Sequence, residues 1–348
     1  MTKTVLLCGY YGEHNLGDDA LLAALLQQLP ASTSALVTAF DRADVEARHG
    51  VATVQRRSPR DVLSALRRAD ALVFGGGSLL QDSTSFQSLL YYAALIAAAR
   101  LQGKPVLLWA QGLGPLRRRR SRALVRALLP WLTAVTWRDA DSATLATQLG
   151  AAKADHAVDA VWSLPREQWL GQGGAIVVCW RPTDWLAGER WSPYLQALAQ
   201  LAEVHNREVL WVPFHREQDQ TLLAALLAEG YVPEGLRQRS RQVEATSPRE
   251  AMAVFRSAGL VIAMRLHALI LGALSGAPVA ALSYDPKVKA CADQIGCPCA
   301  DLASPHPSVE DLSQQWSSAL DQPPGSSRLA ELVAAAAQHR ELLRHLED

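Results

Sequence analysis

The chain lacks a net charge, a long apolar run and cysteines at metal-binding spacing. Lys and Arg number 34, and Asp and Glu also number 34, so we expect no global field for nucleic acid. The longest apolar runs, such as Tyr91 to Ala99, fall far short of a membrane span. Cys291, Cys297 and Cys299 have no partners at zinc-finger spacing, so we predict no metal site.

The beginning of the chain also lacks the pattern of a secretory signal. Thr4–Cys8 is typical of a strand, and no basic stretch followed by an apolar stretch precedes it. Together with the five cysteines, this indicates a reducing, cytoplasmic setting. With 348 residues, of which 49% are hydrophobic, the chain is long enough for two domains with large cores.

Apolar strand-like segments alternate with helical patterns along the whole chain. This alternation predicts an α/β fold of two Rossmann-like domains, in which helices cover parallel sheets. We predict domains at 1–165 and 172–325, a linker near 164–174 and a terminal helix at 326–348. Strands are predicted near residues 4–9, 35–39, 71–75, 105–110, 134–137, 175–180, 208–213, 260–264 and 278–283.

The two predicted domains resemble each other in sequence pattern. Thr4–Cys8 corresponds to Ala175–Cys179, and Arg68–Phe74 corresponds to Arg256–Ile262. We therefore expect two similar open sheets that face each other across a cleft. Ligands of such folds lie outside the carboxyl ends of the strands, so the residues at these ends are the candidates for function.

In the first half, the strand ends are rich in glycine, which lets the backbone approach a ligand closely. Gly75-Gly76-Gly77-Ser78 is predicted to pass directly into a helix, whose free N–H groups could bind an anion. The alternative is a tight strand-to-helix turn without a ligand. The segment is neither a P-loop nor a complete GxGxxG motif.

Asp18 precedes a predicted helix at Ala20–Leu29. Its position is typical of a helix N-cap, and a catalytic or substrate-orienting carboxylate is the alternative. Both roles are compatible.

In the second half, the strand ends carry charge. Arg265 and His267 are two positions apart on a predicted extended segment, so their side chains should point the same way, with Leu266 turned inward. Arg181, His215 and Lys287 follow other predicted strands. Cations that converge from successive strand ends suit an anion with two negative groups, such as a phosphate and a carboxylate. Separate surface charges are the alternative.

A run of arginines occupies Arg117–Arg126 and continues into an apolar segment. This pattern could rest on an anionic membrane surface, or it could be a solvated helix face.

The chain resembles the polysaccharide pyruvyltransferases, especially the branch that acts on bacterial cell-surface polysaccharides. The similarity covers nearly all of the chain up to the terminal helix. The motifs that carry it are Gly9-Tyr10-Tyr11-Gly12 with Asn15-Leu16-Gly17-Asp18, Gly75-Gly76-Gly77-Ser78-Leu79-Leu80-Gln81-Asp82, Gln111-Gly112-Leu113-Gly114-Pro115, Arg265-Leu266-His267 and Tyr284-Asp285-Pro286-Lys287-Val288.

The resemblance implies a glycosyltransferase-B-like (GT-B-like) fold, phosphoenolpyruvate as donor and a sugar diol as acceptor, either in a cell-surface polysaccharide or in its lipid-linked precursor. The product would be a pyruvate ketal, phosphate would be released, and no cofactor beyond the co-substrate phosphoenolpyruvate is expected. The first domain would serve the acceptor and the second the donor. In the family, the Arg-Leu-His segment is associated with donor binding and catalysis, which corresponds here to Arg265 and His267, with Lys287 as a further candidate.

Strand position adds Arg181 and His215 to the donor candidates. We expect Arg265, Arg181 and Lys287 to hold the anionic groups. His267 would donate a proton or stabilise the departing phosphate, and Asp18 would orient or deprotonate the acceptor. The candidate acceptor loops contain Tyr10, Tyr11, Asn15, Gly76, Gly77, Ser78 and Gln111.

Two other functions fit the same residues. A sugar-nucleotide-dependent glycosyltransferase of the same fold could use the cations for a diphosphate, and a non-catalytic glycan- or anion-binding protein could keep the fold. Glu13-His14 departs from the common pattern of the first loop, which leaves acceptor preference open.

Overall fold

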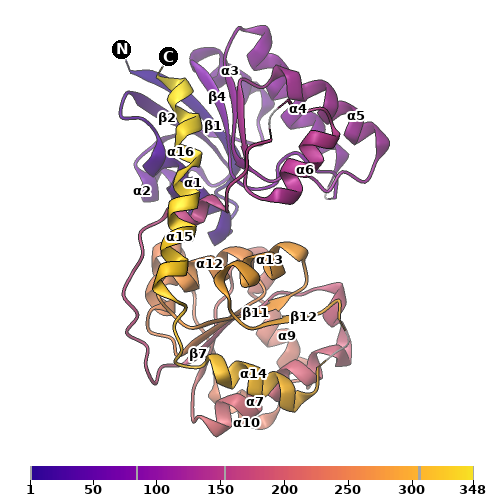
Figure 1. The fold of residues 1–348 in the computed structure, drawn as a ribbon, viewed down its shortest axis with the longest axis vertical. Helices are drawn as coiled ribbons and strands as arrows, with labels where there is room; N and C mark the ends of the chain where they lie inside the picture. Colours follow the sequence, from indigo (N-terminus) through magenta and orange to yellow (C-terminus); the bar gives the residue numbers. More distant parts are fainter. Residues whose placement is uncertain (1, 84, 153, 305–306, 348) are drawn as a thin grey trace. The chain divides into compact units, whose positions relative to one another are not determined.

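The computed structural model describes residues 2–83, 85–152, 154–304 and 307–347. The chain divides into two compact units (Figure 1). The first contains residues 1–13, 18–164 and 333–348, and the second contains residues 14–17 and 165–332. Each unit has a six-stranded sheet with helices around it, so the predicted α/β class with two Rossmann-like domains is confirmed.

The two sheets have the same topology. Their strand orders are β3-β2-β1-β4-β5-β6 and β12-β11-β10-β7-β8-β9, and all of the neighbouring strands described are parallel. Counted within each unit, both orders are 3-2-1-4-5-6, which is the dinucleotide-fold order. The strands are β1 (Lys3–Tyr11), β2 (Thr33–Ala39), β3 (Ala52–Gln55), β4 (Ala71–Gly75), β5 (Val106–Gln111), β6 (Ala134–Trp137), β7 (Ile176–Cys179), β8 (Val209–Trp211), β9 (Ser240–Gln242), β10 (Leu260–Ala263), β11 (Val279–Ser283) and β12 (Cys299–Asp301).

All nine predicted strands are present, and β3, β9 and β12 were not predicted. The central strands β4, β5, β7, β10 and β11 are buried along their whole length, as expected for parallel sheets with both faces covered.

Helices connect the strands and begin at recognisable signals. Ser58, Ser247 and Asp285 accept backbone hydrogen bonds as N-caps, and a proline follows each of them at the start of α3, α11 and α13. The α-helices are α1 (Leu16–Gln28), α2 (Arg42–His49), α3 (Pro59–Arg68), α4 (Phe86–Leu101), α5 (Arg119–Leu128), α6 (Ala140–Gln148), α7 (Ser192–Val204), α8 (Arg216–Asp219), α9 (Leu222–Ala228), α10 (Glu234–Arg239), α11 (Pro248–Phe255), α12 (Leu266–Leu274), α13 (Pro286–Ile295), α14 (Val309–Ala319), α15 (Ser326–Ala337) and α16 (His339–Leu342).

The terminal segment is not one helix. It consists of α15, α16 and the 3-10 helix η5 (Leu343–Leu346). Residues from Val333 onward group with the first unit, although they follow the second unit in the chain. The last part of the chain is therefore part of the first unit's packing rather than a separate appendage.

Candidate active site

The carboxyl ends of four neighbouring strands in the second sheet carry the candidate donor residues. The strands lie in the order β11-β10-β7-β8. Arg181 follows β7, His215 follows β8, Arg265 follows β10 and Lys287 follows β11. Because parallel strands end at the same edge of their sheet, the second unit places all four residues along one edge.

Arg181 and Tyr284 connect the ends of β7 and β11, which β10 separates in the sheet. Nη1 of Arg181 donates a hydrogen bond to the Tyr284 hydroxyl at 3.1 Å, and the guanidinium lies 5.0 Å from the ring centroid. Arg181 is only partly buried. The side chain is therefore oriented by the phenol while part of it stays accessible.

Arg265 is held by Asp219, a residue that the sequence analysis did not select. Nε and Nη2 of Arg265 donate to the two carboxylate oxygens at 3.1 and 2.5 Å, and Nη2 also donates to Gln218 at 3.0 Å. The carboxylate oxygen Oδ2 of Asp219 also accepts from the backbone N–H groups of Phe214 and His215, at 3.1 and 2.8 Å. One buried carboxylate therefore fixes both the guanidinium and the loop after β8.

His215 is a buried imidazole at the same edge. It is 5% exposed, and its Nδ1 has no hydrogen-bond partner among the residues described. Burial, followed by the charge of Arg265, lowers the pKa of His215 below its usual 6.5, although Asp219 acts in the opposite direction. The ring is therefore neutral at neutral pH. An unsatisfied buried polar atom costs about 1–3 kcal/mol, which a bound ligand would offset.

Residues 14–17 come early in the chain but belong to the second unit. Asn15 and His215 form an antiparallel β-bridge, and the N–H of Leu16 donates to the carbonyl oxygen of Phe214 at 3.0 Å. Asn15, a candidate in the first domain's acceptor loops, therefore lies against the donor candidates of the second unit.

His267 packs against Gly17. A Cβ atom at Gly17 would collide with Nδ1 of the His267 ring, so only glycine leaves the ring in its place. The segment 14–17 therefore contacts two of the histidines that the sequence analysis selected.

The predicted extended geometry of Arg265 and His267 is wrong. Strand β10 ends at Ala263, Arg265 is the N-cap residue of α12 with φ −86° and ψ 124°, and His267 is the second residue of that helix. Leu266 is only partly buried rather than turned fully inward. A strand-to-helix turn, rather than the alternation of a strand, positions the pair.

Lys287 is the second residue of α13. Its backbone N–H donates to Oδ1 of Asp285 at 2.9 Å, and the residue is partly buried.

In the first unit, Asp18 lies beside the tyrosines of the first loop. Its Oδ1 is 3.8 Å from the place where a Cβ atom of Gly77 would be. Burial raises the pKa of Tyr10 and Tyr11, and the negative charge of Asp18 contributes to both shifts. Tyr11 is 1% exposed and donates to the carbonyl oxygen of Gly75 at 2.6 Å, so it supports the fold, whereas Tyr10 is 39% exposed.

Asp18 is not an N-cap, contrary to the prediction. Helix α1 begins at Leu16 rather than at Ala20, so Asp18 is its third residue. The side chain of Asn15 accepts from the N–H of Gly17 at 3.1 Å and takes the capping place. The carboxylate of Asp18 therefore lies in the first turn of α1, where the helix dipole stabilises negative charge.

The glycine segment after β4 does not pass directly into a helix. Helix α4 begins only at Phe86, after the N-cap Ser85. Gly76 and Gly77 have φ values of +67° and +73°, which a side chain would disfavour. The segment is a left-handed turn followed by a loop, so the predicted anion site at a helix N-terminus is wrong.

Arg138 is a buried cation of the first unit that the sequence analysis missed. It follows β6, is 7% exposed and donates to Oγ of Ser78 at 2.9 Å. Gln111, at the end of β5, is fully buried and donates to the carbonyl oxygen of Gly76. Arg181 was selected because it follows a strand, and Arg138 follows β6 in the same way, so the sequence contained the signal for it.

Glu13 is buried between two arginines. It is 4% exposed and pairs with Arg56 and with Arg57. Both arginines and Tyr10 line a cavity of about 380 Å³ in the first unit, together with Tyr91. The Arg56 guanidinium lies 4.4 Å from the ring centroid of Tyr10. The cavity combines aromatic faces with hydrogen-bond donors, which suits a sugar.

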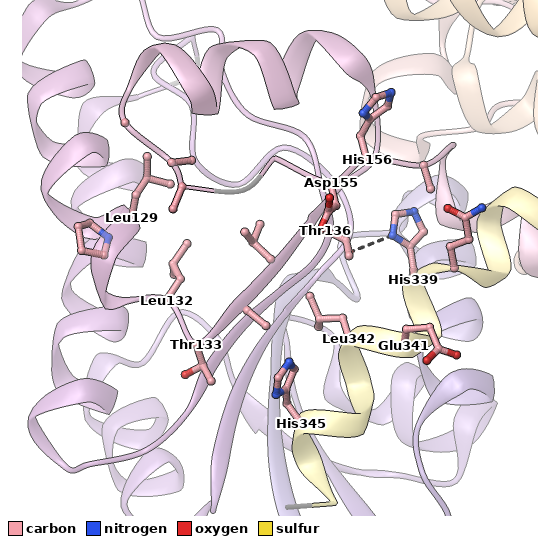
Figure 2. Close-up of a pocket in the computed structure, with 18 residues that line it drawn as sticks. Leu129, Leu132, Thr133, Thr136, Asp155, His156, His339, Glu341, Leu342 and His345 are labelled. Carbon is pink, nitrogen blue, oxygen red and sulfur yellow. Dashed lines mark hydrogen bonds between the residues drawn. The ribbon is translucent and has the colours of Figure 1, made fainter.

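A second cavity, of about 760 Å³, runs along the edge strand β6 (Figure 2). The imidazole of His339 in α16 lies 2.9 Å from Oγ1 of Thr136 and donates through Nε2 to the carbonyl oxygen of Val158 at 2.8 Å. None of the candidate site residues lines this cavity. It marks the contact of the terminal segment with the sheet edge.

Two absences concern the described residues alone. Among residues 2–83, 85–152, 154–304 and 307–347, no three His, Cys, Asp or Glu side chains are grouped in a way that could hold a metal ion. None of the helices that the structure describes combines the length and apolar character needed to span a bilayer.

Solved structures resemble the chain over nearly its full length. UDP-GlcNAc 2-epimerase of Methanocaldococcus jannaschii has 9% identity and a TM-score of 0.63, with 99% of both chains covered. A UDP-glucosyltransferase of Polygonum tinctorium has 12% identity and a TM-score of 0.61, with 99% of this chain and 98% of that chain covered. MurG of Acinetobacter baumannii has 15% identity and a TM-score of 0.51, with 99% of both covered.

The fold is therefore an α/β fold of the GT-B type, as the resemblance implied. No curated protein matches the chain significantly in sequence. The family model for polysaccharide pyruvyl transferase matches residues 15–286, which is most of the chain. The chain belongs to the polysaccharide pyruvyl transferase family, so it is a transferase with a polysaccharide acceptor.

Proposed function

We propose that the protein transfers the pyruvyl group of phosphoenolpyruvate to a sugar diol and forms a cyclic pyruvate ketal. One observation carries this proposal: Arg181, His215 and Arg265 lie together at the carboxyl ends of neighbouring strands in the second unit. Two guanidinium groups beside a neutral imidazole suit a small molecule with a phosphate and a carboxylate.

The chemistry assigns distinct roles to the donor residues. Arg265, Arg181 and Lys287 hold the phosphate and carboxylate, and His267 donates a proton to the methylene carbon of phosphoenolpyruvate. The oxygen-bearing carbon next to it becomes electrophilic, and one sugar hydroxyl forms a bond to that carbon and gives up its proton. The C–O bond to phosphate then breaks, a neighbouring hydroxyl bonds to the same carbon and closes the ketal ring, and the proton of that hydroxyl leaves with the phosphate.

His215 adds a neutral hydrogen-bonding group to this site. Its Nδ1 can pair with a phosphate or carboxylic oxygen in the tautomer that carries a proton there. The bound donor would then satisfy a buried atom that has no partner among the described residues.

The first unit, predicted as residues 1–165, would bind the acceptor, and the region predicted as 172–325 would bind the donor. Asp18 would orient or deprotonate a sugar hydroxyl, since its carboxylate lies beside Tyr10 and Gly77. The cavity at Tyr10, Arg56 and Arg57 is the proposed place for a neighbouring sugar ring. The mechanism uses no metal and no cofactor other than the co-substrate.

We further propose a lipid-linked precursor as acceptor. The reaction would take place in the cytoplasm, with the protein peripheral on the inner face of the cell membrane, where such precursors are presented.

The test is an incubation with phosphoenolpyruvate and a panel of lipid-linked sugars, in which phosphate release and product mass are measured in ordinary and in heavy water. The proposal predicts phosphate release, a ketal adduct on one panel member and one solvent deuterium in its methyl group. Consumption of a sugar nucleotide without any ketal would instead indicate a glycosyltransferase. Phosphoenolpyruvate binding without turnover on any member would indicate a binding protein.

A further inference from the structure

The segment around α5 carries a concentration of positive charge that the proposed reaction does not use. Six arginines fall within ten residues, and all six are exposed. No ion pair within 4 Å joins any of them to a described carboxylate. They are Arg117, Arg118, Arg119, Arg120, Arg122 and Arg126.

Three of the arginines form a stripe along the helix. Arg119, Arg122 and Arg126 are spaced by three and four residues, so they lie within about 60° of each other around the helix axis. The buried residues of α5 are on a different side of the helix, and Figure 1 shows α5 at the periphery of its unit. The buried residues are Ser121, Val125 and Leu128.

The arginines at the start of α5 do not stabilise the helix that carries them. The first turn of α5 contains no acidic residue, and positive charge at a helix N-terminus opposes the helix dipole. Arg122 is also spaced for repulsion with Arg119 and Arg126. An external surface of negative charge would relieve both unfavourable terms.

The start of the basic segment is held by Asp82. The carboxylate of Asp82 accepts from the backbone N–H groups of Arg117 and Arg118 at 2.8 and 2.9 Å, so the start of the segment is fixed to the fold. Helix η1 (Leu129–Trp131) follows α5 directly, and Trp131 is 42% exposed. An exposed tryptophan that follows a basic helix in the chain is typical of protein that contacts the interface of a bilayer.

We propose that Arg119, Arg122, Arg126 and Trp131 form a docking surface for an anionic lipid bilayer. Lipid is favoured over nucleic acid because an exposed indole follows the arginines and because the whole chain carries no net positive charge. The arginines contact anionic headgroups, and the indole enters the interfacial layer. This inference rests on the proposed function in one respect: a lipid-linked acceptor is the reason why the protein would dock on a membrane.

Vesicle binding by the full-length protein tests the surface without any acceptor. The probes are vesicles of phosphatidylcholine with about a quarter of phosphatidylglycerol, and vesicles of phosphatidylcholine alone. The test variant replaces Arg119, Arg122 and Arg126 with Gln. The matched control replaces Arg60, Arg67 and Arg68 with Gln, since these are exposed arginines of α3, a helix of the same unit.

The wild type and the control should sediment with the anionic vesicles and not with the neutral ones. The test variant should partition about a hundredfold more weakly, since each arginine near the surface contributes a severalfold factor. Trp131→Ala should weaken the binding that remains when salt screens the charges.

Equal binding of the test variant and the wild type would overturn the docking surface, and so would a wild type that binds duplex DNA but not the vesicles. The folded state of each variant is checked by its circular dichroism and melting temperature. Pyruvyl transfer to the panel of lipid-linked sugars, dispersed in detergent without vesicles, is measured on the same proteins. A failure of transfer with intact vesicle binding refutes the proposed function alone, and the reverse result refutes the docking surface alone.

Discussion

Asp219→Asn isolates the contact that positions the candidate donor site. Oδ2 of Asp219 accepts from the N–H groups of Phe214 and His215 and from Nε of Arg265, and Oδ1 accepts from Nη2 of Arg265. An asparagine has the same shape but only one oxygen. Its amide NH₂ replaces either Oδ1, facing Nη2 of Arg265, or Oδ2, facing Nε of Arg265 and the two backbone donors. A hydrogen bond to Arg265 is therefore lost in both orientations.

The expected cost follows from burial. The Asp219 side chain has no exposed surface and that of Arg265 is 12% exposed, so the positive charge would be left nearly buried without its partner. Breaking a buried ion pair costs about 3–5 kcal/mol, and asparagine keeps part of the hydrogen bonding, so we expect about 2–3 kcal/mol. This loss lowers the melting temperature by about 4–12 °C for a unit of this size.

The assay combines thermal unfolding, donor kinetics and titration of His215 by NMR. We expect the KM for phosphoenolpyruvate to rise about tenfold or more, because the guanidinium fork is no longer fixed. The pKa of His215 should fall further, because the negative charge of Asp219 raises it.

Asp293→Asn is the matched control. Asp293 forms an exposed pair with Lys289 at 3.0 Å, so its loss should leave stability almost unchanged. If Asp219→Asn behaves like this control in stability, donor KM and the His215 titration, Asp219 does not position the site.

Four further predictions concern single residues. Gly17→Ala should lower transfer sharply with little loss of folded protein, because its Cβ displaces the His267 ring, and normal kinetics would show that the ring can move freely. His267→Ala should abolish ketal formation in a folded protein, and near-normal turnover measured by phosphate release would remove His267 from the mechanism. Arg265→Lys should weaken donor affinity about tenfold, because an ammonium cannot form the bidentate pair, and an unchanged dissociation constant would contradict this. For His339, burial lowers the pKa, so the folded state binds a proton less readily than the unfolded state and stability falls as pH drops below about 6.5; His339→Gln should flatten that dependence in chemical unfolding, and an unchanged slope would refute it.

The sequence was sufficient to predict both sheets because their central strands are continuous apolar runs. β7 and β10 are buried throughout, and no polar residue interrupts their apolar pattern. The missed strands are short edge elements. β9 consists of Ser240, Arg241 and Gln242, whose place in the sheet comes from pairing with β8 rather than from their own side chains.

For the candidate site, the sequence indicated the residues that directly follow strands but not the residues that position them. Asp219 could not be identified because it is four residues beyond His215, in a polar segment that looks like a solvated helix start. Its role depends on the approach of Arg265, 46 residues later in the chain. The docking of residues 14–17 onto the second unit is likewise a long-range contact that no local pattern encodes.

The two corrections at helix starts have a common origin. The sequence pattern placed α1 four residues too late and α4 too early, because Asp18 and the glycines after β4 resemble the usual boundary signals. Asn15 and Ser85 carry the actual caps.

Binding of phosphoenolpyruvate to the full-length protein, measured by titration calorimetry, tests the central claim most directly. The wild type and the control variant Arg249→Gln, an exposed arginine of α11, should bind one molecule per chain. Arg265→Gln and Arg181→Gln should each bind it at least about tenfold more weakly. Equal affinity in all four proteins, or no binding to the wild type, would contradict a donor site at the strand ends of the second unit.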